Sequence, residues 1–282
     1  MLAAAALAVV WVSQGSAPDR KEASAPVATL AKESAGVDDD VLIEGASAAS
    51  AAAAENLALF FGKDDRVFIP APYSGAYAAI GRMETVDGSS CTATLVAPDL
   101  AVTAAHCFLM TPRKFDQGKW FWAGYHEGKW QARYEVVTQV FHPRFTKGLD
   151  YKGEDLYILP KAAPYDIALM KLKFVDGVAP KPMPLYSGNA DKLLARIQSQ
   201  GSKVTQAGFA NDHDDKLTAH QGCTVVALFD NHTLAHQCDT LSGDSGSPLW
   251  LETTEGPQLI AVQSTAPDWF NRDKADNTAV TV

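Results

Sequence analysis

The chain has 282 residues, a formal net charge of −9 and a hydrophobic content of 47%. This length and apolar content predict a packed globular protein with one large or two modest domains. The acidic balance and the lack of clustered Lys and Arg argue against a surface that binds nucleic acid or anionic membranes.

The chain begins with a short apolar segment, MLAAAALAVVWV, which small residues follow. A segment of this length matches the core of a signal peptide and is too short to span a bilayer comfortably. We therefore predict that residues 1–17 are a signal peptide, even though they lack a basic start. The expected location is secreted or periplasmic, without stable membrane insertion.

Residues 18–59 form a low-complexity segment that is rich in Ala, Ser, Pro and Asp and has almost no aromatic residues. Such a composition buries too little apolar surface to offset the entropy lost on ordering. The segment is interpreted as a pro-segment or linker. Its Ala-rich end, residues 46–58, favours a helix because alanine has the highest helix propensity.

Residues 60–282 have a different pattern, in which short runs rich in β-branched residues alternate with turn residues. This pattern predicts an antiparallel sandwich or barrel. One stretch, NADKLLARIQ at residues 189–198, instead predicts a short helix. The predicted strands are CTATLVAP (91–98), AVTAA (101–105), RYEVVTQVF (133–141), KVTQAGF (203–209), CTVVALF (223–229), QLIAVQST (258–265) and TAVTV (278–282).

The four cysteines form two pairs that are close in the sequence. In an exported chain this arrangement predicts two disulfides, Cys91 with Cys107 and Cys223 with Cys238. The alternative is a zinc site, with the ligands His220, Cys223, His236 and Cys238. The spacing of these residues is unlike that of the usual zinc-binding loops. We therefore expect disulfides and no metal.

Three short motifs carry the residues that could perform chemistry. TAAHC places His106 beside a half-cystine, and YDIALMKL places Asp166 at the head of an apolar strand. Each of these two is, on its own, more often a structural residue: a core histidine or an aspartate that caps a turn. In GDSGSP, glycines flank Ser245, which lets backbone N–H groups approach a reacting carbonyl.

In this order the three motifs resemble the signatures of the trypsin-like (chymotrypsin-fold) serine peptidases. The order His, Asp, Ser differs from that of subtilisin-like enzymes and α/β-hydrolases. The similarity covers roughly Asp64 to Val282. The stretches DDRVFIP, AIGRM and CDTLSGDSGSP most resemble the bacterial branch that includes the glutamyl endopeptidases.

The resemblance implies an all-β fold of two antiparallel six-stranded Greek-key β-barrels, with the active site in the cleft between them. Residues 60–282 would form this peptidase domain. The first barrel would span about residues 66–175 and the second about residues 176–282.

The resemblance also implies an exported serine endopeptidase. Ser245 would be the nucleophile, His106 the base, and Asp166 the carboxylate that orients the imidazole. The N–H groups of Gly243 and Ser245 would form the oxyanion hole. Protein or peptide substrates are the expected partners, and no cofactor is expected. The alternative is a non-catalytic binding protein on the same fold.

The indications of substrate preference conflict. Asp239 matches a carboxylate that selects Arg or Lys, whereas Thr240 matches a threonine that contacts a substrate glutamate. Gln263 stands where glutamyl endopeptidases have a histidine, so a glutamate would lose its charged contact, which argues weakly against that preference. The edge strand expected to pair with an extended substrate consists of Ser264, Thr265 and Ala266.

Activation of a zymogen by cleavage is a further expectation. In the trypsin branch, the aspartate beside the nucleophile pairs with the amine that cleavage releases. Asp244 occupies this position, and a cut between Arg66 and Val67 would release such an amine. The alternative is that Asp244 only caps the turn.

Overall fold

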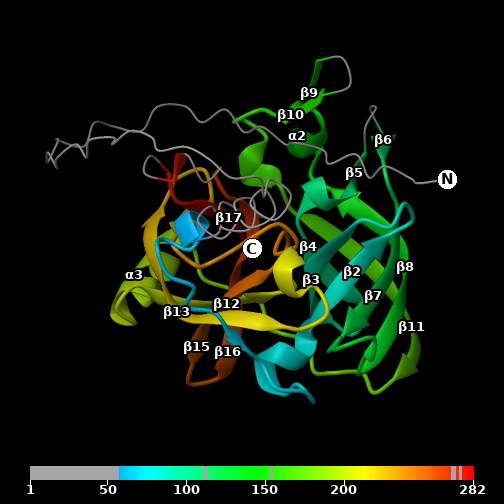
Figure 1. Cartoon of the computed structure of the whole chain (residues 1–282). Coiled ribbons are helices and arrows are strands. Elements are labelled where there is room, and N and C mark those ends of the chain that lie inside the picture. The colour runs from blue at the N-terminus through cyan, green and yellow to red at the C-terminus, as the bar shows by residue number, and fades with distance from the viewer. Residues whose placement is uncertain (1–56, 111–113, 153–154, 268–270, 273–274) are drawn as a thin grey trace, which may run out of the picture.

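The computed structural model describes residues 57–110, 114–152, 155–267, 271–272 and 275–282 (Figure 1). Antiparallel strands dominate this part of the chain, and its helices are few and short. The predicted signal peptide and all but the end of the predicted pro-segment lie outside the described residues, as does most of the Ala-rich stretch.

The first barrel is a closed ring of six antiparallel strands in the order β11-β4-β3-β2-β7-β8. In β11, Ala168, Met170 and Leu172 are buried, while Leu169 and Lys171 between them are exposed. A slip of one residue would exchange these two faces, so the apolar alternation fixes the register. The strands are β2 (Ile80–Thr85), β3 (Ser90–Ala97), β4 (Leu100–Thr103), β7 (Gly118–Ala123), β8 (Ala132–Phe141) and β11 (Ala168–Gly177).

The second barrel runs in the order β13-β12-β15-β16-β17-β14 and closes because β13 also pairs with β14. Its strands are β12 (Lys203–Gly208), β13 (Thr218–Leu228), β14 (Thr233–His236), β15 (Pro248–Thr253), β16 (Gly256–Thr265) and β17 (Asn277–Thr281). Two closed six-stranded antiparallel barrels confirm the predicted fold class.

A short strand before the first barrel belongs structurally to the second. In β1 (Val67–Phe68), Val67 lies opposite Ala219 and Phe68 lies opposite Thr218 of β13. The sequence prediction began the first barrel at about residue 66. The backbone pairing instead assigns this entry segment to the second barrel.

The remaining elements connect the strands of the barrels. The predicted helix is present as α3, where Asn189 caps the N-terminus by accepting from the N–H of Lys192. Within the described residues, no helix is long and apolar enough to cross a membrane. These connecting elements are η1 (Gly75–Ala79), η2 (Ala105–Phe108), β5 (Leu109–Met110), β6 (Lys114–Phe115), α2 (Pro143–Thr146), β9 (Leu149–Lys152), β10 (Asp155–Ile158), η3 (Ala163–Tyr165), α3 (Ala190–Ser199) and η4 (Asn211–His213).

One hydrophobic cluster joins the two barrels. It includes Ile80 and Phe121 of the first barrel together with Phe209 and Trp250 of the second. A smaller cluster packs α3 against the second barrel. Because the larger cluster spans both barrels, packing fixes the position of one barrel relative to the other, and with it any site between them.

Candidate active site

Three side chains from distant parts of the chain form one line of hydrogen bonds. His106 lies in η2, Asp166 directly follows η3, and Ser245 lies in the loop before β15. The Nδ1 atom of His106 is 2.7 Å from Oδ2 of Asp166, and its Nε2 atom is 2.7 Å from Oγ of Ser245. The structure therefore brings the three residues of the predicted triad together.

The Asp166 carboxylate is held by more than the imidazole. Its Oδ1 atom accepts the backbone N–H of His106 at 2.8 Å, and its Oδ2 atom accepts the hydroxyl of Ser264 at 2.6 Å. The carboxylate is fully buried, so these hydrogen bonds replace water around its charge. Ser264, predicted only as a substrate-binding residue, thus also fixes the orientation of Asp166.

Burial and charge act in opposite directions on this pair. Burial lowers the pKa of His106, but the charge of Asp166 and the hydrogen bond to it outweigh burial and raise that pKa above its ordinary value. Burial raises the pKa of Asp166, but the charge and hydrogen bonds of His106 and the hydroxyl of Ser264 lower it overall. An ionised Asp166 therefore favours a protonated imidazole.

Both predicted disulfides are present. Cys91 of β3 is bonded to Cys107 of η2, directly beside His106. Cys223 of β13 is bonded to Cys238. The alternative zinc site is therefore wrong, because both of its cysteines are oxidised and cannot act as thiolate ligands.

Glycines shape the loop around Ser245. Gly243 has a φ of 96°, and a Cβ there would lie 2.4 Å from the carbonyl oxygen of Phe209. Gly246 has a φ of 84°, and a Cβ there would lie 2.1 Å from Oγ1 of Thr103. Both positions therefore require glycine. Among the described residues, no hydrogen bond occupies the backbone N–H groups of Gly243 and Ser245.

Thr92 of the first barrel holds this loop of the second barrel. Its backbone N–H donates to the carbonyl of Ser245 at 2.9 Å. Its hydroxyl donates to the carbonyl of Gly243 at 3.1 Å and accepts the N–H of Phe209 at 2.9 Å. Sequence reasoning missed Thr92 because its partners are more than 100 residues away and no local motif marks it.

Asp244 is turned inward in this chain. Its Oδ2 atom accepts the N–H of Leu241 at 3.0 Å and the hydroxyl of Thr240 at 3.2 Å. Burial raises its pKa to about 6, although these hydrogen bonds act to lower it. In the intact chain the carboxylate therefore caps the turn, and the hydroxyl of Thr240 is directed to it.

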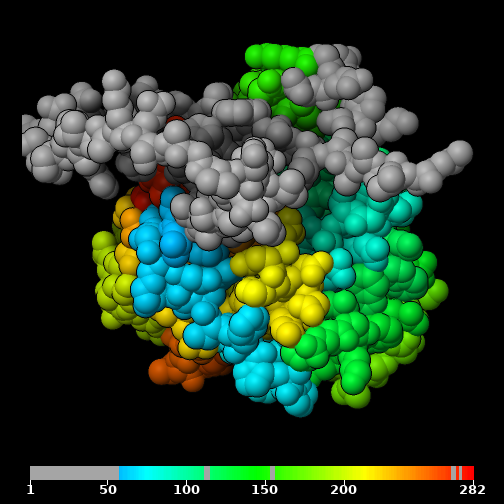
Figure 2. All heavy atoms as spheres, in the orientation of Figure 1, coloured from blue at the N-terminus to red at the C-terminus, as the bar shows by residue number. Residues whose placement is uncertain are grey.

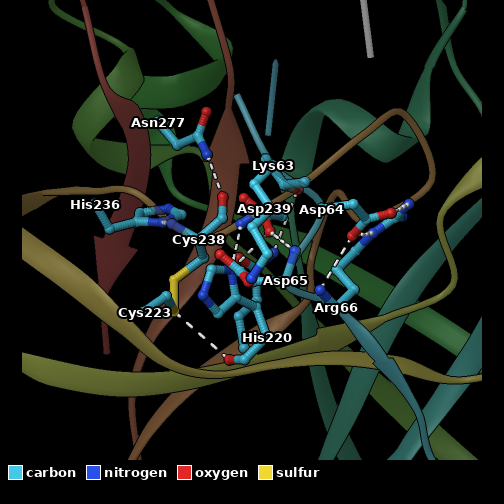
Figure 3. Close-up of polar contacts among 12 residues, drawn as sticks. Lys63, Asp64, Asp65, Arg66, His220, Cys223, His236, Cys238, Asp239 and Asn277 are labelled. Atoms are coloured by element: carbon cyan, nitrogen blue, oxygen red, sulfur yellow. Dashed lines mark hydrogen bonds and ion pairs between the residues drawn. A yellow bond between two sulfur atoms is a disulfide. The ribbon is translucent and has the colours of Figure 1, made fainter. Parts of the chain in front are cut away.

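The carboxylate of Asp239 is engaged by two other segments of the chain (Figure 3). Its Oδ2 atom accepts the backbone N–H of Asp65 at 2.7 Å and lies 3.1 Å from Nδ1 of His220. Asp65, His220 and Asp239 also form a group whose potential metal-ligand atoms all lie within 4.8 Å of one another. We assign no metal to it, since Oδ2 of Asp239 accepts the N–H of Asp65, Nδ1 of His220 accepts the N–H of Asp239, and Lys63 pairs with the Asp65 carboxylate.

Gln263 is fully used within the protein. Its Oε1 atom lies 2.7 Å from Nε2 of His236, and its Nε2 atom donates to the carbonyl of Thr265 at 3.1 Å. Burial lowers the pKa of His236 to about 3, so this histidine is neutral and donates to Gln263. Sequence reasoning gave His236 no role as a partner of Gln263, because their strands β14 and β16, which both pair with β17, come near each other only in the folded barrel.

The segment before β1 packs on the second barrel. In the space-filling view its blue surface lies against the yellow segment around η4 (Figure 2). The guanidinium of Arg66 pairs there with Asp64 at 2.9 Å and Asp212 at 2.6 Å, and its side chain is only 4% exposed. The structure does not favour a cut after Arg66, since an activating enzyme would have to reach this buried side chain.

Comparison with known proteins agrees with this architecture. The sequence profile of the trypsin family matches residues 70–279. A solved Glu endopeptidase in complex with MPD has a TM-score of 0.59 at 19% identity, covering 78% of this chain and 92% of its own. The protease Anisep from Arthrobacter nicotinovorans has a TM-score of 0.53 at 14% identity, covering 74% and 91%. No curated protein sequence matches the chain significantly.

The two barrels and the profile match define a serine endopeptidase of the chymotrypsin fold. The chain belongs to the trypsin family. The two solved structures share its fold at low sequence identity, and the resemblance on which the sequence prediction depended is confirmed at that level.

Proposed function

We propose that this chain is an exported endopeptidase that cleaves peptide bonds through an acyl-enzyme intermediate. Ser245 is the nucleophile, His106 the general base and acid, and Asp166 the orienting carboxylate. The observation that carries this proposal is the continuous line of hydrogen bonds from Asp166 through His106 to Ser245. Each contact is within the distance that proton transfer or tautomer selection requires.

In the acylation step, Oγ of Ser245 attacks the carbonyl carbon of the scissile bond while Nε2 of His106 takes the hydroxyl proton. The charge of Asp166 stabilises the imidazolium that forms. The tetrahedral intermediate then collapses, the C–N bond breaks, and His106 gives its proton to the leaving amine. The acyl group stays on Ser245.

In the deacylation step, a water molecule takes the place of the leaving amine. His106 removes one of its protons while the oxygen attacks the acyl carbon. Collapse of the second tetrahedral intermediate releases the new carboxylate, and Oγ of Ser245 regains its proton from His106. The site thus returns to its starting protonation state.

The backbone N–H groups of Gly243 and Ser245 stabilise the negatively charged oxygen in both steps. Their proposed role is supported by the absence of any competing hydrogen bond among the described residues and by the left-handed conformation of Gly243. Losing one such donor typically costs about 3–4 kcal/mol of transition-state stabilisation. Residues 264–266 provide the backbone edge that pairs with an extended substrate, as the exposure of Ala266 allows.

Export and processing complete the proposal. Two disulfides are typical of proteins that fold in an oxidising compartment, so we place the chain in a secreted or periplasmic location. Residues 62–65 are all exposed and lie just before Arg66 and β1. An accessible segment of this kind is where proteolytic removal of a pro-segment would take place.

A fluorophosphonate probe tests the proposed nucleophile directly. The wild-type protein should become labelled, whereas the Ser245→Ala variant should fold normally and stay unlabelled. Equal labelling of both proteins would contradict the assignment of Ser245. A folded wild type that neither reacts nor cleaves peptides would instead favour the non-catalytic binding protein, and N-terminal sequencing of active material locates any processing site.

A further inference from the structure

A half-buried arginine that follows β16 in the chain, Arg272, has N–H groups without a hydrogen-bond partner among the described residues. Arg272 donates from Nη2 to Oδ1 of Asn277 at 2.8 Å. Its Nε and Nη1 atoms are buried and have no hydrogen-bond partner among the described residues. Buried donors without partners are costly, and more so on a charged group. The planar guanidinium is therefore poised to bind an anion, and its geometry matches a carboxylate.

Among the described contacts, the nearby carboxylates do not bind the unpaired N–H groups of Arg272. Asp239 and Asp276 are the carboxylates whose charges act on it, and neither forms an ion pair with it among the described contacts. Asp239 accepts the N–H of Asp65, and Asp276 accepts from the side chain of Gln237. Burial lowers the pKa of Arg272 to about 10 despite both carboxylates. Its positive charge is therefore incompletely compensated.

Asn277, the partner of Arg272, links it to the residue before Asp239 and lies next to the strand residue that pairs with the proposed substrate-binding edge. Asn277 donates to the carbonyl of Cys238 at 2.6 Å, directly before Asp239 (Figure 3). Thr278, which follows Asn277 in β17, is paired with Thr265 of the edge strand. A group bound to the guanidinium would therefore lie near both segments.

Gln263 stands where glutamyl endopeptidases have a histidine, and its side chain carries no charge. The amide of Gln263 is occupied by neutral His236 and by the carbonyl of Thr265. The charge of Arg272 acts on His236, where it helps to lower the pKa. Arg272 thus places a positive charge close enough to act on His236, the hydrogen-bond partner of Gln263.

A phenylalanine from the N-terminal segment covers this guanidinium. The Cζ atom of Arg272 lies 4.4 Å from the centre of the Phe61 ring. Phe61 has a φ of 54°, in the left-handed region that costs a non-glycine residue about 1 kcal/mol or more. Exposed Gly62 follows it. The N–H of Phe61 donates to the carbonyl of Ala58 and the N–H of Gly62 donates to that of Leu57, so local backbone hydrogen bonds hold this turn. A movement of the turn would carry the Phe61 ring away from Arg272.

We propose that Arg272 is a specificity-determining residue that binds an acidic side chain of the substrate, and that Phe61 covers it until the N-terminal segment is displaced. This inference rests on the proposed function, because it names the substrate class of the same site. It differs from the expectation based on Gln263, which argued against an acidic substrate. The charge comes from a residue that the sequence comparison did not consider.

Two matched peptides, with Glu or Gln before the scissile bond, measure the effect of the substrate charge alone. We expect the full chain to prefer the Glu peptide. The Arg272→Gln variant should lower kcat/KM for that peptide by about 10- to 100-fold, the size of one charged hydrogen-bond pair, and leave the Gln peptide nearly unchanged. The Phe61→Ala variant should raise kcat/KM for the Glu peptide in the full chain.

Fluorophosphonate labelling separates this inference from the proposed function. If the Arg272→Gln variant is labelled at Ser245 but keeps the wild-type ratio of Glu to Gln cleavage, the inference is wrong and the peptidase mechanism stands. A wild-type preference for Arg or Lys would also overturn it. Should Arg272→Gln fail to fold, Arg272→Met removes the charge while keeping an unbranched apolar stem, and an unchanged ratio in that variant is equally contradictory. Absence of labelling in the folded wild type would instead reject the proposed function itself.

Discussion

At the residue scale, one buried carboxylate sets the pH range in which the base can act. Asp166 raises the pKa of His106 above 6.5 against the effect of burial. Only the neutral imidazole accepts the proton of Ser245. Activity should therefore be complete above the raised pKa and be lost as the pH falls through it.

Replacing Asp166 by Asn should move this acid limb to lower pH. Burial then dominates and lowers the pKa of His106, so the imidazole stays neutral in more acidic solution. The plateau rate should fall by up to about 10⁴-fold, because the amide no longer selects the productive tautomer. Measuring kcat/KM against pH checks both effects. Ser264→Ala, which keeps the charge of Asp166, is the control. An acid limb that stays in place in the Asp166→Asn variant would contradict this account.

Sequence reasoning found the residues that short motifs mark. His106 stands beside a half-cystine, and Ser245 stands between glycines that the loop requires. The directions of Asp239 and Thr240 could not be predicted, because they depend on contacts with other side chains and with the N-terminal segment. Arg272 carries no motif, and its interest arises only from its buried Nε and Nη1 atoms, which have no hydrogen-bond partner among the described residues.

At the element scale, the disulfide between β3 and η2 fixes the short helix that carries the base. The bond joins Cys91 to Cys107 across 16 residues, and His106 is the neighbour of Cys107. A crosslink across a loop of this length contributes about 3 kcal/mol by restricting the unfolded chain. Because Cys107 neighbours His106, we expect this disulfide also to restrain the position of His106.

Replacing Cys91 and Cys107 by Ala should lower the free energy of unfolding by about 3 kcal/mol and also reduce kcat/KM. The pair Cys223 and Cys238, separated by 15 residues, is the matched control, because it closes a loop of nearly equal length without neighbouring the base. Denaturant unfolding and peptide cleavage of both double variants test this. Equal losses of kcat/KM in the two variants would argue against a local effect on His106.

Runs rich in β-branched residues predicted seven of the barrel strands, and the NADKLLARIQ stretch predicted α3; the seven strands are β3, β4, β8, β12, β13, β16 and β17. The position of β1 was not predicted, because a strand of two residues has no period of its own. Its pairing with β13 is a long-range contact that only the folded chain reveals.

At the scale of the whole molecule, the site depends on how the first barrel supports a loop of the second. The hydroxyl of Thr92 joins the carbonyl of Gly243 to the N–H of Phe209, and all three groups are buried. Because these groups are buried, loss of the hydroxyl leaves both backbone groups without a partner, which is costly. The interface between the barrels therefore acts on the loop that carries the nucleophile.

Replacing Thr92 by Val keeps the shape and the strand propensity but leaves both backbone groups without a partner. Each unsatisfied buried group should cost about 1–3 kcal/mol of unfolding free energy. Because one of them belongs to Gly243, kcat should fall more than KM rises, as expected when a transition-state contact is misplaced. Thr92→Ser keeps the hydroxyl and should retain most activity despite its smaller side chain. Denaturant unfolding and peptide kinetics on the two variants separate the effect of packing from that of hydrogen bonding. Equal kcat values in Thr92→Val and Thr92→Ser would show that the hydroxyl between the barrels does not position the loop.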